Sequence, residues 1–240
     1  MGSLPHELSR PGHPLKTPVY HHTLITSDYD ALKFQAASSL QLQSSQSTYH
    51  RATTTSSHLI TSPYNLPGHL LDLHTLNIPN QLLAKALTVL KPIRPDYATA
   101  PYTESFNWDY VFEVLRELAK EEGYEWATQS FYVVTFRSVL SGSADLERLT
   151  ELDAHSHEEA TVSGGLLKYW FGTKDGERRN LASCIWRSRD DARLGGLGPW
   201  HKQARAAARE LYEKIEFTTL RLVIDDGAKS WEMTTWEDAE

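Results

Sequence analysis

The chain has 240 residues, of which 40% are hydrophobic and 23% are charged, so it is long enough and apolar enough to bury a sizeable core. A formal net charge of -7 gives no electrostatic reason to bind nucleic acid or an anionic membrane surface, and neither partner is expected. The single cysteine, Cys184, excludes an intramolecular disulfide and a multi-thiolate metal site, which favours a reducing compartment such as the cytoplasm.

Residues 1–57 are rich in Pro, His, Ser, Thr and Gln and lack a periodicity that would bury a face, so we expect a disordered, low-complexity arm. Mitochondrial targeting is the alternative for this arm, although Glu7, Asp28 and Asp30 are acids that such peptides avoid. No run approaches the roughly 20 apolar residues that cross a bilayer. Residues 58–240 are expected to form a single α+β domain.

Two helices are predicted ahead of the main sheet. The stretch 69–78 alternates as a strand does, and 79–90 follows with Pro79 placed to begin a helix and with leucines at helical spacing. Residues 107–123 put aromatic and aliphatic side chains on one helical face and end at Gly123, a residue type common at helix C-caps.

The rest of the chain reads as β-α-β-β-α-β, the order of a ferredoxin-like split βαβ unit with an antiparallel sheet and both helices on one face. This unit is expected over residues 130–225. A further edge strand is consistent with residues 229–236. The elements are strands over 130–140, 165–173, 180–188 and 217–225, and helices over 144–162 and 199–215.

The stretch "DAHSHEEA" at 153–160 has the composition of a metal site or an acid/base cluster. On a helix, successive residues turn by about 100°, so His155 and His157 point apart and cannot bind one metal ion together. His155 and Glu159 are predicted to face solvent, whereas Asp153 and His157 lie one turn apart beside the buried stripe. That stripe is predicted to consist of Leu146, Leu149 and Ala160, with Leu152 close by.

The Asp153 and His157 pair admits two interpretations. It either satisfies a polar seam between helix and sheet, or forms a general base, with Asp153 hydrogen-bonded to His157 and orienting it. His201 is a second candidate base, because the positive end of its predicted helix favours the neutral imidazole. A surface role is the alternative for His201.

Strand alternation divides the sheet into two faces, and the second one mixes aromatic residues with Arg137, Lys168 and Arg221. Such a face is expected to be covered by a second copy of the sheet, by the N-terminal elements or by a ligand, and its cations suit an anionic or enolate-like group. A solvated amphipathic face is the alternative. The first face consists of Tyr132, Val134, Phe136, Tyr169, Phe171, Leu220, Leu222 and Ile224, and the second of Phe131, Val133, Thr135, Arg137, Lys168, Trp170, Thr219, Arg221 and Val223.

The motifs "SGGLLKYWFG", "NLASCIWRSRDDARLGGLGPWHKQA", "FYVVTFRS" and "RPDYATAPY" resemble a family of uncharacterised proteins found widely in fungi, over residues 68–236. More distantly, Trp-x-Ser-x-x-Asp-Ala followed by Gly-Pro-x-His is similar to dimeric α+β barrel proteins of the antibiotic-biosynthesis monooxygenase type. That likeness implies a homodimer that packs sheet against sheet around a small-molecule cavity. It carries over Trp186, Ser188, Asp191, Ala192 and His201.

The function expected from these observations is binding of a small aromatic or anionic molecule in an α+β barrel cavity. The chemistry that fits is cofactor-independent oxygenation or isomerisation, with no cofactor and no metal, and whether the protein is an enzyme is left open. His157, oriented by Asp153, or His201 is the expected base. The rival hypothesis is a non-enzymatic, dimeric interaction or scaffold protein. The expected ligand-binding residues are Arg137, Lys168, Trp170, Trp186 and Arg221.

Overall fold

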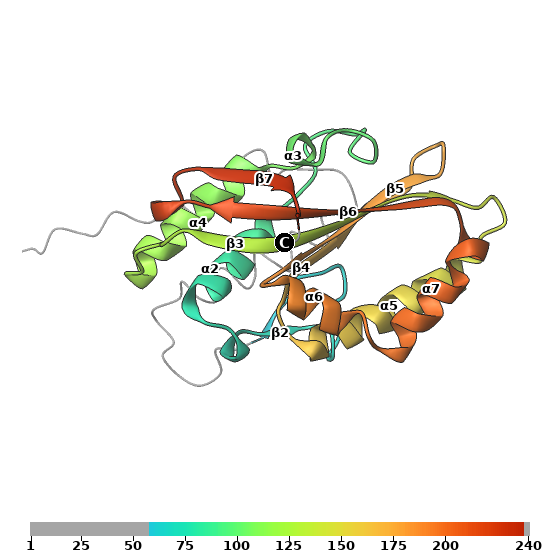
Figure 1. Ribbon diagram of the computed structural model, residues 1–240, viewed down its shortest axis with the longest axis horizontal. Helices are drawn as coiled ribbons and strands as arrows, with labels where there is room; N and C mark the ends of the chain where they lie inside the picture. The colour runs from blue at the N-terminus through green and yellow to red at the C-terminus, as the bar shows by residue number, and fades with distance from the viewer. Residues whose placement is uncertain (1–57, 238–240) are drawn as a thin grey trace, which may run out of the picture.

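The computed structural model describes residues 58–237, which are organised around a five-stranded antiparallel sheet (Figure 1). Its strands lie in the order β4-β5-β3-β6-β7, and the helices α5, α6 and α7 connect them in the order β-α-β-β-α-β. The predicted ferredoxin-like class is therefore confirmed, and β7 adds the edge strand. The strands are β3 (Gln129–Leu140), β4 (Leu166–Phe171), β5 (Arg179–Trp186), β6 (Tyr212–Ile224) and β7 (Trp231–Thr235). The arm expected over residues 1–57 lies outside the described residues.

The connecting helices differ from the prediction at one end. Helix α7 stops at Leu211 and the chain passes directly into β6, so the helix predicted over 199–215 extends too far. Strand β6 pairs with the whole length of β3, and this pairing overrides the local helical pattern. The helices are α5 (Leu146–Ser163), α6 (Arg189–Gly195), which was not predicted, and α7 (Pro199–Leu211).

The N-terminal elements precede the sheet and include the two predicted helices. The strand expected over 69–78 is wrong in its extent. Only Leu71–Asp72 forms a strand, and a turn of 3-10 helix follows it. Gly123 ends α4 with a φ of +69°, the left-handed C-cap that was predicted. These elements are β1 (His58–Leu59), β2 (Leu71–Asp72), η2 (Leu73–Thr75), α2 (Ile78–Ala86), η3 (Leu87–Val89), α3 (Tyr102–Ser105) and α4 (Trp108–Glu122), and η4 (Asp226–Ala228) lies between β6 and β7.

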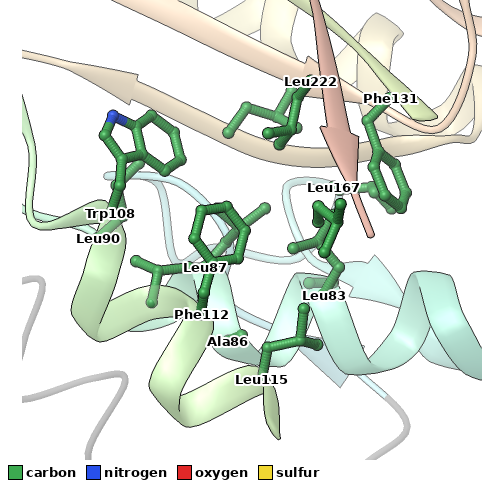
Figure 2. Packing of buried hydrophobic residues seen from close by; sticks show 14 of the residues in the cluster. Leu83, Ala86, Leu87, Leu90, Trp108, Phe112, Leu115, Phe131, Leu167 and Leu222 are labelled. Atoms are coloured by element: carbon green, nitrogen blue, oxygen red, sulfur yellow. The ribbon is translucent and has the colours of Figure 1, made fainter. Parts of the chain in front are cut away.

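The larger core cluster lies between the sheet and the N-terminal helices. Figure 2 shows side chains of α2 and α4 pointing toward residues of the sheet, and in Figure 1 these two helices lie at the opposite end of the sheet from α5 and α7. Of the three covers expected for this sheet face, a second copy, the N-terminal elements or a ligand, the structure shows the N-terminal elements. Members of this cluster include Leu83, Leu87, Phe112 and Leu115 from the helices and Phe131, Val133, Leu167, Ile185 and Leu222 from the sheet.

The side chains of β6 point to the opposite faces of the sheet from those predicted. Leu222 lies opposite Phe131 and Leu220 lies opposite Val133, so both leucines face the N-terminal helices, while Arg221 faces the other side. Because helices cover both faces, apolar residues occur on both, and alternation alone cannot fix which face is which.

Trp186, at the end of β5, is 4% exposed and packs directly against Gly195 of α6. A Cβ on Gly195 would lie 2.3 Å from the Trp186 ring, so Gly195→Ala is expected to lower the free energy of unfolding by about 2 kcal/mol through overpacking. Urea denaturation measures this loss. Gly176→Ala is the control, since a Cβ there has no atom within 4 Å, and equal stability of the two variants would contradict the packing argument.

Candidate functional site

Two tyrosine hydroxyls meet one buried carboxylate between α5, β4 and the segment 62–69 that leads into β2. The hydroxyl of Tyr64 donates to Oδ2 of Asp153, and that of Tyr169 donates to Oδ1, both at 2.5 Å. Each carboxylate oxygen therefore accepts one short, charge-assisted hydrogen bond. This arrangement ties the segment 62–69, α5 and β4 to a single group.

Two histidines meet beside this carboxylate. Nδ1 of His69 lies 2.9 Å from Nδ1 of His157, and the two rings are stacked with centroids 5.1 Å apart. Tyr64 stacks on His69 at 4.8 Å, and Tyr169 lies 5.2 Å from His157. We refer to Tyr64, His69, Asp153, His157 and Tyr169 as the polar cluster.

One atom of the polar cluster is left without a partner. His157 is 4% exposed, and its Nε2 is fully buried with no hydrogen bond among residues 58–237. Such an atom costs about 1–3 kcal/mol relative to a satisfied one, because it has lost its water without gaining a replacement. The cluster therefore contains one buried imidazole nitrogen whose hydrogen-bonding capacity is not satisfied by any group in the described part of the chain.

Helix α5 brings Asp153 and His157 to this position. Asp145 caps the helix by accepting from the backbone N–H of Arg148, and the buried side chains begin at Leu152. Leu146, predicted to start the buried stripe, is 48% exposed, because α5 meets the sheet only from its second half onward. The inward placement of Asp153 and His157 is confirmed. The buried residues of α5 are Leu152, Ser156, His157 and Ala160.

The predicted contact between Asp153 and His157 is wrong. Asp153 accepts from Tyr64 and Tyr169, and His157 pairs instead with His69. The tyrosines approach the carboxylate from β4 and from segment 62–69, and they occupy the oxygens that an imidazole would use. Tyr64 and His69 were not anticipated, since no local pattern in "SPYNLPGH" distinguishes them.

Burial sets the protonation states of the cluster. It raises the pKa of Asp153, an effect that the hydrogen bonds from Tyr169 and Tyr64 oppose. Burial is the main cause that lowers the pKa of His157 to about 3, and the neighbouring His69 and His201 contribute to this shift. Burial also lowers the pKa of His69, an effect that the negative charge of Glu158 opposes. The pKa of Tyr64 and that of Tyr169 are raised by burial and then by the charge of Asp153. At neutral pH both tyrosines are donors and both histidines are neutral.

His201 and Glu159 form a separate contact at the start of α7. The Glu159 carboxylate accepts from the backbone N–H groups of Trp200 and His201 at 2.8 and 3.1 Å, and it lies 3.0 Å from Nδ1 of His201. Glu159 thus caps α7, and its side chain is only 17% exposed, so the predicted solvent position is wrong for this residue. His155 keeps 42% exposure and stacks on Trp200.

Arg137 and Trp170 lie on the sheet face that the N-terminal elements cover. The Arg137 guanidinium donates to the backbone carbonyls of Tyr97, Ala98 and Ala100, and it therefore holds the loop before α3. Trp170 is 8% exposed and meets the ring of Phe106 edge to face at 4.8 Å. Both residues are engaged by the chain itself.

The remaining predicted ligand-binding residues are spread through the fold. Lys168 is fully buried on the same face as Trp170, and burial lowers its pKa well below the ordinary value. Arg221 lies on the opposite face, 4.6 Å from the centre of the Trp236 ring. Three strand spacings separate β6 from β4, about 14 Å. The structure therefore does not bring Arg137, Lys168 and Arg221 to one place.

The motif after β5 builds a helix start. Ser188 caps α6 by accepting from the backbone N–H of Asp191, and the Asp191 carboxylate accepts from Arg187 at 2.7 Å. Trp186 packs beneath this turn. These contacts account for the Trp-x-Ser-x-x-Asp spacing, and Trp186 faces the interior of the smaller core cluster.

A groove of about 520 Å³ lies beside the polar cluster, between β2 and the end of α5. Gly68 and Leu70, the two chain neighbours of His69, line it, and so does Thr161, whose hydroxyl donates to the carbonyl of His157. In residues 58–237, no group of three or more His, Cys, Asp or Glu side chains is placed to hold a metal ion. No helix in the same range is long and apolar enough to cross a membrane.

Comparison with solved structures returns small α+β proteins. Rv0793 from Mycobacterium tuberculosis is 20% identical and matches 38% of this chain and 92% of its own, with a TM-score of 0.34. SnoaB, a cofactor-independent oxygenase from Streptomyces nogalater, is 14% identical over 38% of this chain and 90% of its own, with a TM-score of 0.31.

Sequence relatives give a closer match. The family model described as PB2B2.08-like matches residues 60–235. The UPF0643 protein PB2B2.08 of Schizosaccharomyces pombe is 36% identical over 188 residues, which is 75% of this chain and 84% of that protein. The match spans the whole sheet, the N-terminal helices and the polar cluster, and it confirms the fungal resemblance read from the motifs. The chain therefore belongs to the PB2B2.08-like family.

Proposed function

We propose that the protein binds a small, neutral aromatic molecule at the polar cluster and that His157 accepts a proton or a hydrogen bond from it. The observation that carries the proposal is the buried, unpartnered Nε2 of His157. Every other hydrogen-bonding side-chain atom described for the cluster is either paired or not fully buried. Nε2 of His157 is therefore the one atom of the cluster that is fully buried and lacks a hydrogen-bond partner.

The surroundings favour an aromatic ligand. Tyr64, His69 and Tyr169 present rings around His157, and Phe171 lies 5.7 Å from Tyr169 and 6.1 Å from Tyr64. A flat ring would extend this stack with favourable offset or edge-to-face contacts.

Charge argues against an anionic ligand at the cluster. An anion beside the Asp153 carboxyl group would meet no compensating cation, because the predicted cations Arg137, Lys168 and Arg221 lie elsewhere in the fold. The aromatic half of the expected ligand class is therefore retained and the anionic half is set aside.

The neutral imidazole of His157 has a lone pair that can accept a hydrogen bond or a proton, and its low pKa makes it a weaker base than an exposed histidine. When the proton on Nδ1 is the one shared with His69, the lone pair on Nε2 of His157 is free, and a substrate O–H or C–H proton moves to it. The electron pair stays on the substrate as a phenolate or enolate. Cofactor-independent oxygenation and isomerisation share this first step, and the proposal extends to that step.

Nuclear magnetic resonance of protein labelled with ¹⁵N-histidine tests the proposal. Phenol is the probe, and benzoate and cyclohexanol are the anionic and non-aromatic comparisons. We expect phenol to shift the Nε2 signal of His157 saturably and to bind at least about tenfold more tightly than either comparison.

The variants His157→Phe and His155→Gln complete this experiment. His157→Phe keeps a ring but removes the nitrogen, so phenol binding is expected to weaken by about tenfold, the value of one lost buried hydrogen bond. His155→Gln lies on the same helix outside the cluster and should bind as the wild type does. Unchanged binding by His157→Phe, or no saturable shift in the wild type, would refute the proposal.

A second candidate function is a homodimeric interaction protein, favoured by one exposed aromatic side chain. Phe217 of β6 is 60% exposed and meets Phe136 of β3 edge to face at 5.0 Å. If this face joins two copies, Phe217→Ser should shift the sedimentation coefficient from that of a dimer to that of a monomer. A wild-type protein that sediments as a monomer excludes this candidate.

A further inference from the structure

The contact between His69 and His157 restricts where protons can be. Two ring nitrogens 2.9 Å apart form a hydrogen bond only when one carries a proton and the other does not. With both rings neutral, the pair has two arrangements. If His157 holds the shared proton, its Nε2 is bare and Nε2 of His69 is protonated; if His69 holds it, the reverse is true.

We propose that His69 is a proton relay between solvent and His157, an inference that rests on the proposed function of His157 as the accepting group. The steps balance. A proton that arrives at Nε2 of His157 makes that ring a cation, and the shared proton then moves from Nδ1 of His157 to Nδ1 of His69. His69 releases the proton on its own Nε2 to water. His157 is left neutral with a protonated Nε2, ready to act as an acid.

The position of His69 supports this role. Both of its chain neighbours, Gly68 and Leu70, line the groove, whereas no residue within three positions of His157 along α5 does. His69 is 8% exposed and His157 is 4% exposed. Of the four ring nitrogens of the pair, Nε2 of His157 is the one that is both fully buried and unpartnered. His69 thus follows and precedes residues that line the groove, and its Nδ1 contacts the ring that carries the buried nitrogen.

The backbone at Gly68 holds His69 in this place. Its φ of +92° is a conformation that glycine adopts readily, and a Cβ there would lie 2.7 Å from Oε1 of Glu158. The close approach of Glu158 also puts a negative charge near His69. The other charged or titratable groups near the pair are Tyr64, Asp153, His155, Tyr169 and His201. The carboxylates Glu158 and Asp153 favour a transient cation on His69, which the relay requires.

The relay has a consequence that a single isolated base lacks. A base sealed from solvent returns the proton that it removed, whereas a relay replaces that proton with one from water. The ring N–H of His157 should therefore exchange with solvent although it is buried.

Hydrogen exchange of the ¹⁵N-labelled rings, measured without any ligand, tests the relay. The wild type is expected to show both tautomers of the pair in exchange and a ring N–H of His157 that exchanges at least about tenfold faster than in His69→Asn. Asparagine keeps a hydrogen-bonding group near the position of Nδ1 but cannot pass a proton through its side chain. His74→Asn, at an exposed position outside the cluster, is the control and should match the wild type.

The outcomes separate the relay from the proposed function. Equal exchange rates in the wild type and His69→Asn would overturn the relay even if phenol binds. If His69→Asn does not fold, the wild-type tautomers decide the question, since one fixed tautomer without exchange also overturns it. Absence of phenol binding with fast, His69-dependent exchange would refute the proposed ligand and leave the relay standing.

Discussion

The free energy of unfolding is expected to fall by roughly 4 kcal/mol between pH 6.5 and pH 3 because of His157 alone. Burial lowers the pKa of this residue from an ordinary 6.5 to about 3 in the folded protein. In this window the unfolded chain binds a proton at His157 and the folded chain does not, so acid favours unfolding. The stability that depends on a neutral His157 is fully present above pH 6.5 and is lost progressively as the pH falls toward 3.

Urea denaturation at half-unit pH intervals measures this slope. His157→Phe should flatten it, because phenylalanine fills the site and does not titrate. His74→Gln is the matched control, since His74 is exposed, and its profile should follow that of the wild type. A wild-type slope that survives in His157→Phe would show that other groups, such as His69, dominate acid unfolding.

Asp153→Ala is expected to lower the free energy of unfolding by about 3 kcal/mol at neutral pH. The substitution removes the acceptor of both tyrosine hydroxyls and leaves Tyr64 and Tyr169 with buried donors that have lost their partner. It also removes the link from Tyr64 to α5 and leaves His69–His157 as the remaining side-chain hydrogen bond between the segment 62–69 and that helix. The relief of burying a carboxylate offsets part of this loss, since burial raises the pKa of Asp153.

Two variants bracket this prediction. Asp153→Asn should lose about half as much stability. Its side-chain oxygen still accepts from one tyrosine hydroxyl, whereas its NH₂ group is a donor and cannot accept from the other. Asp190→Ala removes a carboxylate whose side chain is 87% exposed and should change stability by less than about 0.5 kcal/mol. If Asp153→Ala is as stable as Asp190→Ala, the two hydrogen bonds contribute nothing.

The fold follows from the sequence wherever local pattern and long-range pairing agree. The strand at 130–140 and the helix at 107–123 have strong periodicity and lie within two residues of their predicted bounds. Disagreement arises at 212–215, where Ile215 continues the helical spacing of Ala204, Ala207 and Leu211 but β3 offers a partner strand. The inverted alternation of β6 has the same origin, because its register is set by β3 and not by its own residues.

Three of the five residues of the polar cluster could be placed from the sequence. Helical geometry places Asp153 and His157 together on the inner side of α5, and strand alternation places Tyr169 on the face that they meet. Tyr64 and His69 come from a segment 89 and 88 residues earlier in the chain than their partners, without regular structure to reveal their direction. Because Tyr64 donates to Asp153 and His69 contacts His157, the observed pair is His69 with His157 and not the predicted Asp153 with His157.

The cover on the sheet has a consequence for biosynthesis. Helices α2 and α4 leave the ribosome before any strand of the sheet that they cover, and β6, which supplies Leu222 to their core, is made after β3, β4 and β5. Before the strands are made, the apolar surfaces of the two helices can contact each other but lack the sheet that buries them in the folded protein. Synthesis of this protein should therefore depend more on chaperones that shield the early helices than synthesis of a sheet-first chain of equal length.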